Sequence, residues 1–191
     1  MGKRILYLLL VVFAVLTATA QTKPQPATKD ANLSSWLRDI YARDHNFITG
    51  AAEKMPEEYY NLRPGPQMEV RTFGQILGHV VNYNYIMCSA AKGERNPDQD
   101  TDFEKVTTKA GLVKALNDVF TYCDAVYGSL TEASAMETVP PPPGRWPWNR
   151  GATRASMLAF NGMHNEEHYG NLVTYMRIKS IVPPSSERGP R

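Results

Sequence analysis

Apolar residues recur at helical spacing in four long segments of the chain, and each segment predicts an α-helix. The segments cover residues 32–55, 72–91, about 107–130 and 153–179. Strand-like alternation of apolar and polar residues is nearly absent from the rest of the chain. The pattern therefore predicts an all-α protein in which the four helices bury their apolar faces in one bundle.

Polar and proline-rich stretches separate the predicted helices. Residues 56–71 contain three prolines, which exclude regular helix across much of this connector. Residues 92–106 are long for a bundle loop, and they can return along the bundle before the third helix begins. Residues 131–152 include four consecutive prolines and predict a non-helical loop. We expect Trp146 and Trp148 to place this loop over one end of the bundle or to form a surface binding patch.

The first 20 residues have the layout of a secretory signal. Lys3 and Arg4 precede an apolar run, and Ala18-Thr19-Ala20 supplies the small residues that a signal peptidase recognises. The apolar run is short compared with the roughly 20 residues of a membrane span. We therefore favour cleavage after Ala20 over an uncleaved anchor, and we expect a periplasmic or secreted protein with no stable membrane span.

The rest of the chain divides into a tether, one domain and a tail. Residues 21–31 are polar and proline-rich and predict a disordered tether, residues 32–186 form the bundle, and residues 187–191 are a polar tail. The signal contains two of the 21 basic residues and none of the 19 acidic ones, so the mature chain is formally neutral. Without a basic surface excess, the sequence gives no indication of a nucleic-acid partner.

Three histidines occupy inward-facing positions of two predicted helices. His164 and His168 are four residues apart, which places both imidazoles on one face of a helix. His79 lies on the apolar stripe of the second helix, together with Ile76 and Tyr83. Neutral imidazole is the commonest protein ligand for a transition metal, and three such ligands leave coordination positions for water or substrate. The sequence therefore predicts an open divalent-metal site.

Glycines accompany the predicted metal ligands. Gly74 and Gly78 flank the histidine of the second helix, and Gly170 follows the histidine pair of the fourth. Glycine inside a helix costs about 1 kcal/mol relative to alanine. The glycines either permit a close approach at the site or are simply tolerated in helices held by tertiary packing.

Two polar residues of the first helix lie on or beside its apolar stripe. Asp44 falls within the stripe, and a carboxylate there needs a partner. Either Asp44 faces the polar site, or the stripe is frayed and the carboxylate meets water. His45 lies at the edge of the stripe, and we interpret it as a surface residue.

The two cysteines, Cys88 and Cys123, each lie well inside a predicted helix. In an oxidising compartment two thiols can pair. They meet only if their helices are adjacent and parallel, which the residues alone do not settle. On this ground we favour two buried thiols that act as small hydrophobic side chains.

Three segments, in order, resemble the DinB-like superfamily, which also contains the bacillithiol transferases. These segments are EKMPEE (residues 53–58) with Arg63-Pro64, RTFGQILGHV (71–80), and HNEEHYGNLVTY (164–175) with IVPPS (181–185). The resemblance implies a four-helix bundle in up-down-down-up order. It also implies that His79, His164 and His168 hold a divalent metal ion. Parallel second and third helices would favour a Cys88–Cys123 bridge.

Two functions agree with these features. The first is a metal-dependent hydrolase or thiol transferase, in which Zn²⁺ or Ni²⁺ lowers the pKa of bound water or of a thiol of an unknown small-molecule substrate. Asp44, Tyr83 and Glu167 are candidates for acid–base or supporting roles in that enzyme. The alternative is a non-catalytic binding or structural protein of the bacterial cell envelope, in which the metal pins two helices together. A homodimer is compatible with either function.

Overall fold

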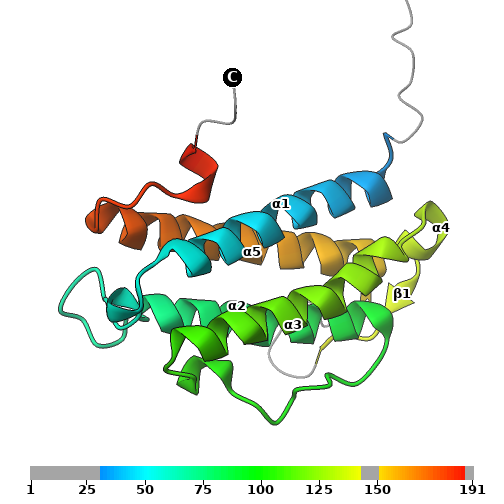
Figure 1. Ribbon diagram of the computed structural model, residues 1–191. Helices are drawn as coiled ribbons and strands as arrows, with labels where there is room; N and C mark the ends of the chain where they lie inside the picture. Colours follow the sequence, from blue (N-terminus) through cyan, green and yellow to red (C-terminus); the bar gives the residue numbers. More distant parts are fainter. Residues whose placement is uncertain (1–30, 143–150, 188–191) are drawn as a thin grey trace, which may run out of the picture.

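The computed structural model describes residues 31–142 and 151–187, and four long helices account for most of them. They are α1 (Leu33–Lys54), α2 (Phe73–Lys92), α3 (Lys109–Gly128) and α5 (Arg154–Ile178). All four lie where the apolar pattern predicts helices. In Figure 1, α1 and α5 form one layer of the bundle, and α2 and α3 form the other.

Several sequence predictions lie outside the described residues. These are the signal peptide, the tether apart from its last residue, the two tryptophans of the proline-rich loop, and the tail from residue 188 onward. Within the described ranges, no helix is both long enough and apolar enough to cross a membrane.

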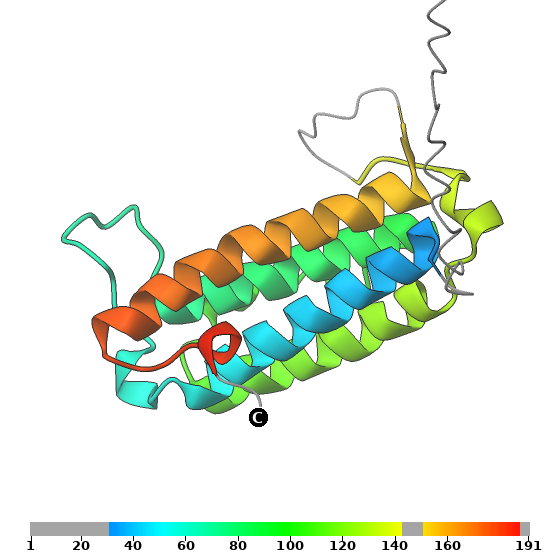
Figure 2. The same cartoon turned by 90° about the horizontal axis from the view of Figure 1, so that it is seen from above.

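The helix directions follow the predicted up-down-down-up order. The colour gradients in Figures 1 and 2 show that α1 runs parallel to α5 and that α2 runs parallel to α3. The two pairs run in opposite directions. Seen from above in Figure 2, α5 lies beside α2, whereas α1 lies beside α3. This order brings α2 and α5, the helices that carry the three predicted metal ligands, into direct contact.

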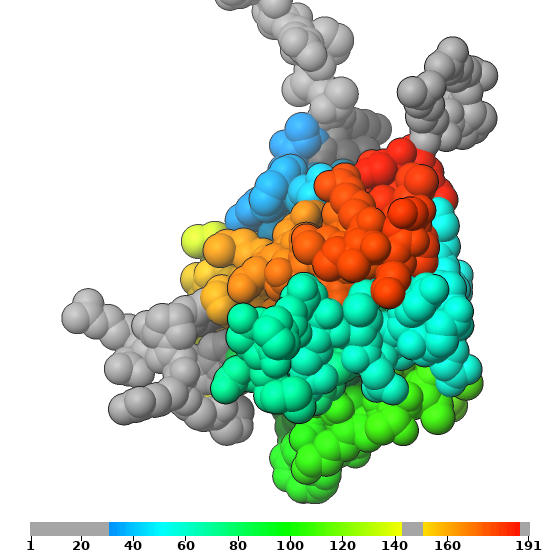
Figure 3. Space-filling model, turned by 90° about the vertical axis from the view of Figure 1, so that its left-hand side faces the viewer, coloured from blue at the N-terminus to red at the C-terminus, as the bar shows by residue number. Residues whose placement is uncertain are grey.

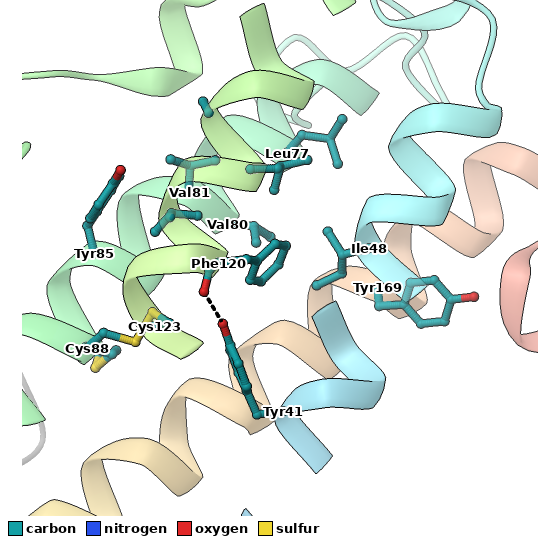
Figure 4. Close-up of a cluster of buried hydrophobic side chains, with 14 of the residues drawn as sticks. Tyr41, Ile48, Leu77, Val80, Val81, Tyr85, Cys88, Phe120, Cys123 and Tyr169 are labelled. Atoms are coloured by element: carbon teal, nitrogen blue, oxygen red, sulfur yellow. Dashed lines mark hydrogen bonds between the residues drawn. A yellow bond between two sulfur atoms is a disulfide. The ribbon is translucent and has the colours of Figure 1, made fainter. Parts of the chain in front are cut away.

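A disulfide joins the two parallel helices. Cys88 of α2 and Cys123 of α3 are bonded, with their Cα atoms 5.5 Å apart (Figure 4). The expectation of two buried thiols, drawn from the residues alone, was therefore wrong. Parallel packing of α2 and α3 brings the two cysteines to the same level, and this pairing was favoured by the resemblance to the DinB-like superfamily.

Tyr41 of α1 packs and hydrogen-bonds against α3 in the core. Its ring stacks on Tyr127 with ring centroids 4.0 Å apart, and its hydroxyl donates a 2.9 Å hydrogen bond to the carbonyl oxygen of Phe120 (Figure 4). All three residues are buried. Because the hydroxyl has a partner, this aromatic cluster fills the core without leaving a polar group unsatisfied.

Threonine caps define the starts of α2 and α5, the two helices that carry the three predicted metal ligands. The Thr72 hydroxyl accepts a hydrogen bond from the backbone N–H of Gln75, and the Gln75 side chain accepts one from the Thr72 N–H. This reciprocal pair is a capping box at the start of α2. Thr153 caps α5 by accepting from the backbone N–H of Ser156. Both caps are the first residues of the segments, 72–91 and 153–179, that the apolar pattern predicts to be helical.

The prediction of a non-helical loop over residues 131–152 was partly wrong. A one-turn helix, α4 (Glu132–Ala135), begins at Thr131, whose side chain caps it. Beyond it, β1 (Thr138–Val139) pairs antiparallel with β2 (Ala152–Thr153). The run of prolines starts only after β1, so it excludes neither the short helix nor the strand pair.

Three short 3₁₀ helices complete the fold: η1 (Glu57–Tyr59), η2 (Phe103–Lys105) and η3 (Pro184–Ser186). The second of them packs against α2 at Gly78. A Cβ atom on that glycine would lie 2.3 Å from the carbonyl oxygen of Phe103. Only a residue without a side chain allows η2 to approach α2 this closely.

Candidate metal centre

Three imidazoles converge between α2 and α5. The Nε2 atom of His164 lies 3.2 Å from Nε2 of His79 and 3.0 Å from Nε2 of His168. All three side chains are buried, with at most 9% of their surface exposed. Two nitrogens bound to one tetrahedral zinc ion at about 2.0–2.1 Å are about 3.3 Å apart. The three nitrogens could therefore hold one metal ion. They belong to the three histidines that the sequence predicts as metal ligands.

A carboxylate orients the first of these imidazoles. Oε1 of Glu104 lies 2.7 Å from Nδ1 of His79, and the Arg71 Nε donates a 2.9 Å hydrogen bond to Oε2. Burial raises the pKa of Glu104, but hydrogen bonds from Arg71 and His79 outweigh it and hold that pKa below its usual value. An ionised carboxylate assigns the ring proton of His79 to Nδ1. The Nε2 lone pair is then free to bind a metal.

A buried amide network fixes the register of α2 against α5. Asn84 donates to Oδ1 of Asn165 at 2.7 Å, and Asn161 donates to Oδ1 of Asn84 at 2.9 Å. Asn161 also donates to the hydroxyl of Tyr127 at 3.2 Å. The three asparagines are fully buried. Because Asn165 directly follows His164 in the chain, the network also sets the level at which the α5 histidines face α2.

The environment keeps the three imidazoles neutral. Burial, reinforced by the neighbouring imidazoles and by Arg71, lowers the pKa of His164 to about 3. Burial, His79 and Arg71 likewise lower the pKa of His168 to about 4. Burial also lowers the pKa of His79, although Glu104 opposes this shift. Neutral imidazole is the form that binds a metal, so the cluster is in its ligand form at neutral pH.

Of the other candidate residues, Tyr83 lies at the site. Its ring stacks on the His164 ring at a centroid distance of 4.0 Å and an interplanar angle of 7°, and it lies 4.5 Å from the ring of His79. Glu167 is exposed, and its charge acts on His79 and His168 only by raising their pKa values. The structure therefore gives Tyr83 direct contact with the cluster and Glu167 a longer-range electrostatic influence.

Asp44 lies elsewhere, in the interface of α1 and α5. It is only 1% exposed, and its Oδ2 would lie 3.7 Å from a Cβ atom on Gly162. Neither oxygen has a hydrogen-bond partner of normal geometry among the described residues, and Oδ1 is 4.0 Å from Nε of Arg43. Burial, followed by the neighbouring Glu166 carboxyl group, raises the pKa of Asp44 to about 8. Asp44 thus faces inward, but toward α5 rather than toward the histidines.

We expect Asp44→Asn to flatten the pH dependence of stability between pH 5 and 8. Because the raised pKa keeps Asp44 protonated in the folded chain while the unfolded chain releases the proton, stability falls as pH rises through this window. The variant should be more stable than the wild type at pH 8, by on the order of 2 kcal/mol. Urea denaturation at several pH values measures this difference. The exposed Asp39 of the same helix provides the control Asp39→Asn, and equal slopes for wild type and Asp44→Asn would refute the expectation.

Sequence reasoning missed several supporting residues and left the role of one glycine open. Glu104 and Arg71 lie outside the apolar stripes, so helical periodicity gives no signal for them. Gly170 has open space around the position of a Cβ atom, so it is tolerated rather than required. His45 is half-buried rather than a plain surface residue, and its ring stacks on Phe120 with centroids 4.4 Å apart.

The chain matches the family model of the DinB superfamily over residues 42–172 and belongs to this superfamily. A DinB-like protein from Bacillus cereus ATCC 10987 has a similar structure, with a TM-score of 0.65 and 14% identity over 78% of this chain and 95% of that one. A DinB-like protein from Bacillus subtilis gives a TM-score of 0.58 and 15% identity over 80% and 99% of the two chains.

A conserved protein from Enterococcus faecalis is also similar, with a TM-score of 0.59 and 15% identity over 76% of this chain and 95% of that one. No curated protein matches the chain. At these identities the structural likeness establishes the fold alone, because one fold can carry many different functions.

Proposed function

We propose that the protein is an exported, metal-dependent enzyme in which His79, His164 and His168 hold one divalent ion, Zn²⁺ or Ni²⁺. The observation that supports this most is the convergence of three buried Nε2 atoms, with adjacent separations of 3.0 and 3.2 Å. When bound, such an ion lowers the pKa of water or of a substrate thiol and supplies a nucleophile at neutral pH. The reaction would be a hydrolysis or a thiol transfer.

Neighbouring residues orient one of the three imidazole rings and cover a face of another. Glu104 holds the His79 ring in the required tautomer, and the Tyr83 ring covers one face of His164. A cavity of about 290 Å³ adjoins His168 and is lined also by Arg71 and Asn171. We call it the Arg71 cavity. It lets a small molecule reach His168 of the cluster, and such access is what a catalytic centre needs and a purely structural one does not.

We expect about one metal ion per chain in protein purified without a His tag, and a loss of most of it in His164→Ala and His168→Ala. Three nitrogen ligands are the usual minimum for such a site, so removal of one should reduce retained metal to about a tenth or less. Elemental analysis measures the content. The matched control is His45→Ala, because His45 is the fourth histidine of the chain and lies outside the cluster. Unchanged metal content in the two α5 variants would refute the proposal.

The export of the protein is part of the proposal. Its supports are the predicted signal over residues 1–20 and the Cys88–Cys123 disulfide, because disulfides persist mainly in oxidising compartments. Protein recovered from the cell envelope or the medium should begin at Gln21. N-terminal sequencing tests this, and a chain that is found in the cytosol with its first 20 residues intact would contradict it.

The deep burial of the histidines favours one alternative, a non-catalytic protein in which the metal pins α2 to α5. The two functions differ in the coordination positions that the protein leaves open. X-ray absorption spectroscopy of metal-loaded protein should show an exchangeable water ligand if the site is catalytic. A metal that is fully coordinated by protein atoms would favour the structural function.

A further inference from the structure

The Arg71 cavity lies at one end of the bundle, between the connector that precedes α2 and the C-terminal half of α5. Figure 3 shows this end, where the connector (cyan to blue-green) lies against the last turns of α5 (orange to red). Val70 and Ile76 contribute apolar surface to the cavity, and Asn171 contributes an amide. His168 belongs to the same lining, so a molecule bound here lies beside one of the three candidate metal ligands.

The guanidinium group of Arg71 is held from one side only. Its Nε donates to Glu104, whereas its two terminal nitrogens make no hydrogen bond with any residue in the described ranges. The backbone of Arg71 is also fixed, because the hydroxyl of Tyr175 donates to its carbonyl oxygen. The side chain is 42% exposed. Arg71 therefore forms part of the cavity wall and has two terminal nitrogens available to donate hydrogen bonds to a bound molecule.

We propose that Arg71 binds the carboxylate of a small organic acid and places the rest of that molecule in the cavity beside His168. The inference rests on the proposed function, because it makes this acid the substrate of the histidine centre. The guanidinium fork matches the two oxygens of a carboxylate, and paired charged hydrogen bonds of this kind are strong and specific. The apolar stem of the acid would lie against Val70 and Ile76.

The charges around the cavity favour a monoanion. Among the described residues, Arg71 is the only lysine or arginine in the lining, and the one carboxylate there, Glu69, is exposed. In the metal-free protein, a dianionic phosphate would therefore lack a second positive partner. A cavity of about 290 Å³ is at the small end of the usual ligand range of about 300–1,000 Å³, so the acid should have only a few carbons.

Titration of the metal-free full-length mature protein with sodium butyrate, followed by two-dimensional NMR, tests the inference. We expect saturable shifts at His168 and Asn171, with little or no effect from n-butanol or butylammonium. Arg71→Gln should raise the dissociation constant of butyrate at least tenfold, because a charged hydrogen-bonding partner is lost. Arg63→Gln is the matched control, since Arg63 lies in the same connector but outside the cavity lining.

A second variant tests the cavity while it keeps Arg71 and the contact of Arg71 with Glu104. Thr174 lines the cavity and is exposed on α5, so Thr174→Phe should block butyrate without removing a charge or a ligand. Butyrate binding that survives both Arg71→Gln and Thr174→Phe would overturn the inference, as would tighter binding of inorganic phosphate. Because the titration uses metal-free protein, its result does not depend on metal content. Butyrate binding without any metal uptake would therefore refute the proposed function and leave the carboxylate site standing.

Discussion

Gly78→Ala should lower the free energy of unfolding by about 3 kcal/mol, at the upper end of typical overpacking effects. The added Cβ would lie 2.3 Å from the carbonyl oxygen of Phe103 and 2.7 Å from the backbone nitrogen of Glu104. These are backbone atoms, so no flexible side chain can move aside. If η2 retreats, the Glu104 carboxylate leaves His79, and loss of such a supporting contact typically weakens metal binding about 10–100-fold. Urea denaturation and competition with a chelator measure the two effects.

Gly170→Ala is the matched control for this prediction. It also replaces a helical glycine by alanine near the histidines, but its Cβ meets nothing within 4 Å. Alanine is the better helix former, so this variant should be more stable than the wild type by about 0.5–1 kcal/mol. Similar behaviour of the two variants would show that the approach of η2 to α2 does not need glycine.

The double replacement of Cys88 and Cys123 by alanine should lower the free energy of unfolding by about 3–4 kcal/mol. The disulfide closes a loop between residues 35 positions apart, and the cross-link restricts the unfolded chain. Guanidinium denaturation with and without a reductant measures the loss. Reductant should destabilise the wild type by a similar amount and leave the double variant unchanged. If the reduced and oxidised wild type unfold at the same denaturant concentration, the disulfide does not stabilise the fold.

The helices and the inward direction of the histidines could be predicted because both are local properties of the sequence. Apolar residues every three or four positions define a buried face, and any residue on that face, such as His79, points inward. The caps at Thr72 and Thr153 are equally local, because each involves a residue only three positions away. These signals needed no knowledge of which helices are neighbours.

The remainder of the site depends on contacts between residues that are far apart in the chain. Glu104 reaches His79 only because a crossover segment returns to α2, and Asn84 meets Asn165 only after α5 has packed. The bonding of Cys88 to Cys123 likewise requires the directions of two helices. Periodicity carries none of this information. The resemblance to a known superfamily supplied the helix order, and with it the argument for the bridge.

The separation of the histidines along the chain limits which contacts of the domain can form first. Residues 79 and 164 are 85 positions apart, whereas the disulfide and the Glu104–His79 contact join residues of the first three long helices and the crossover. A chain that emerges from its N-terminus can therefore make those earlier contacts before α5 is present. The histidine cluster is complete only when α5 docks. Metal uptake should accordingly report the completion of folding, and the rate at which α5 docks sets the earliest time at which the protein can function.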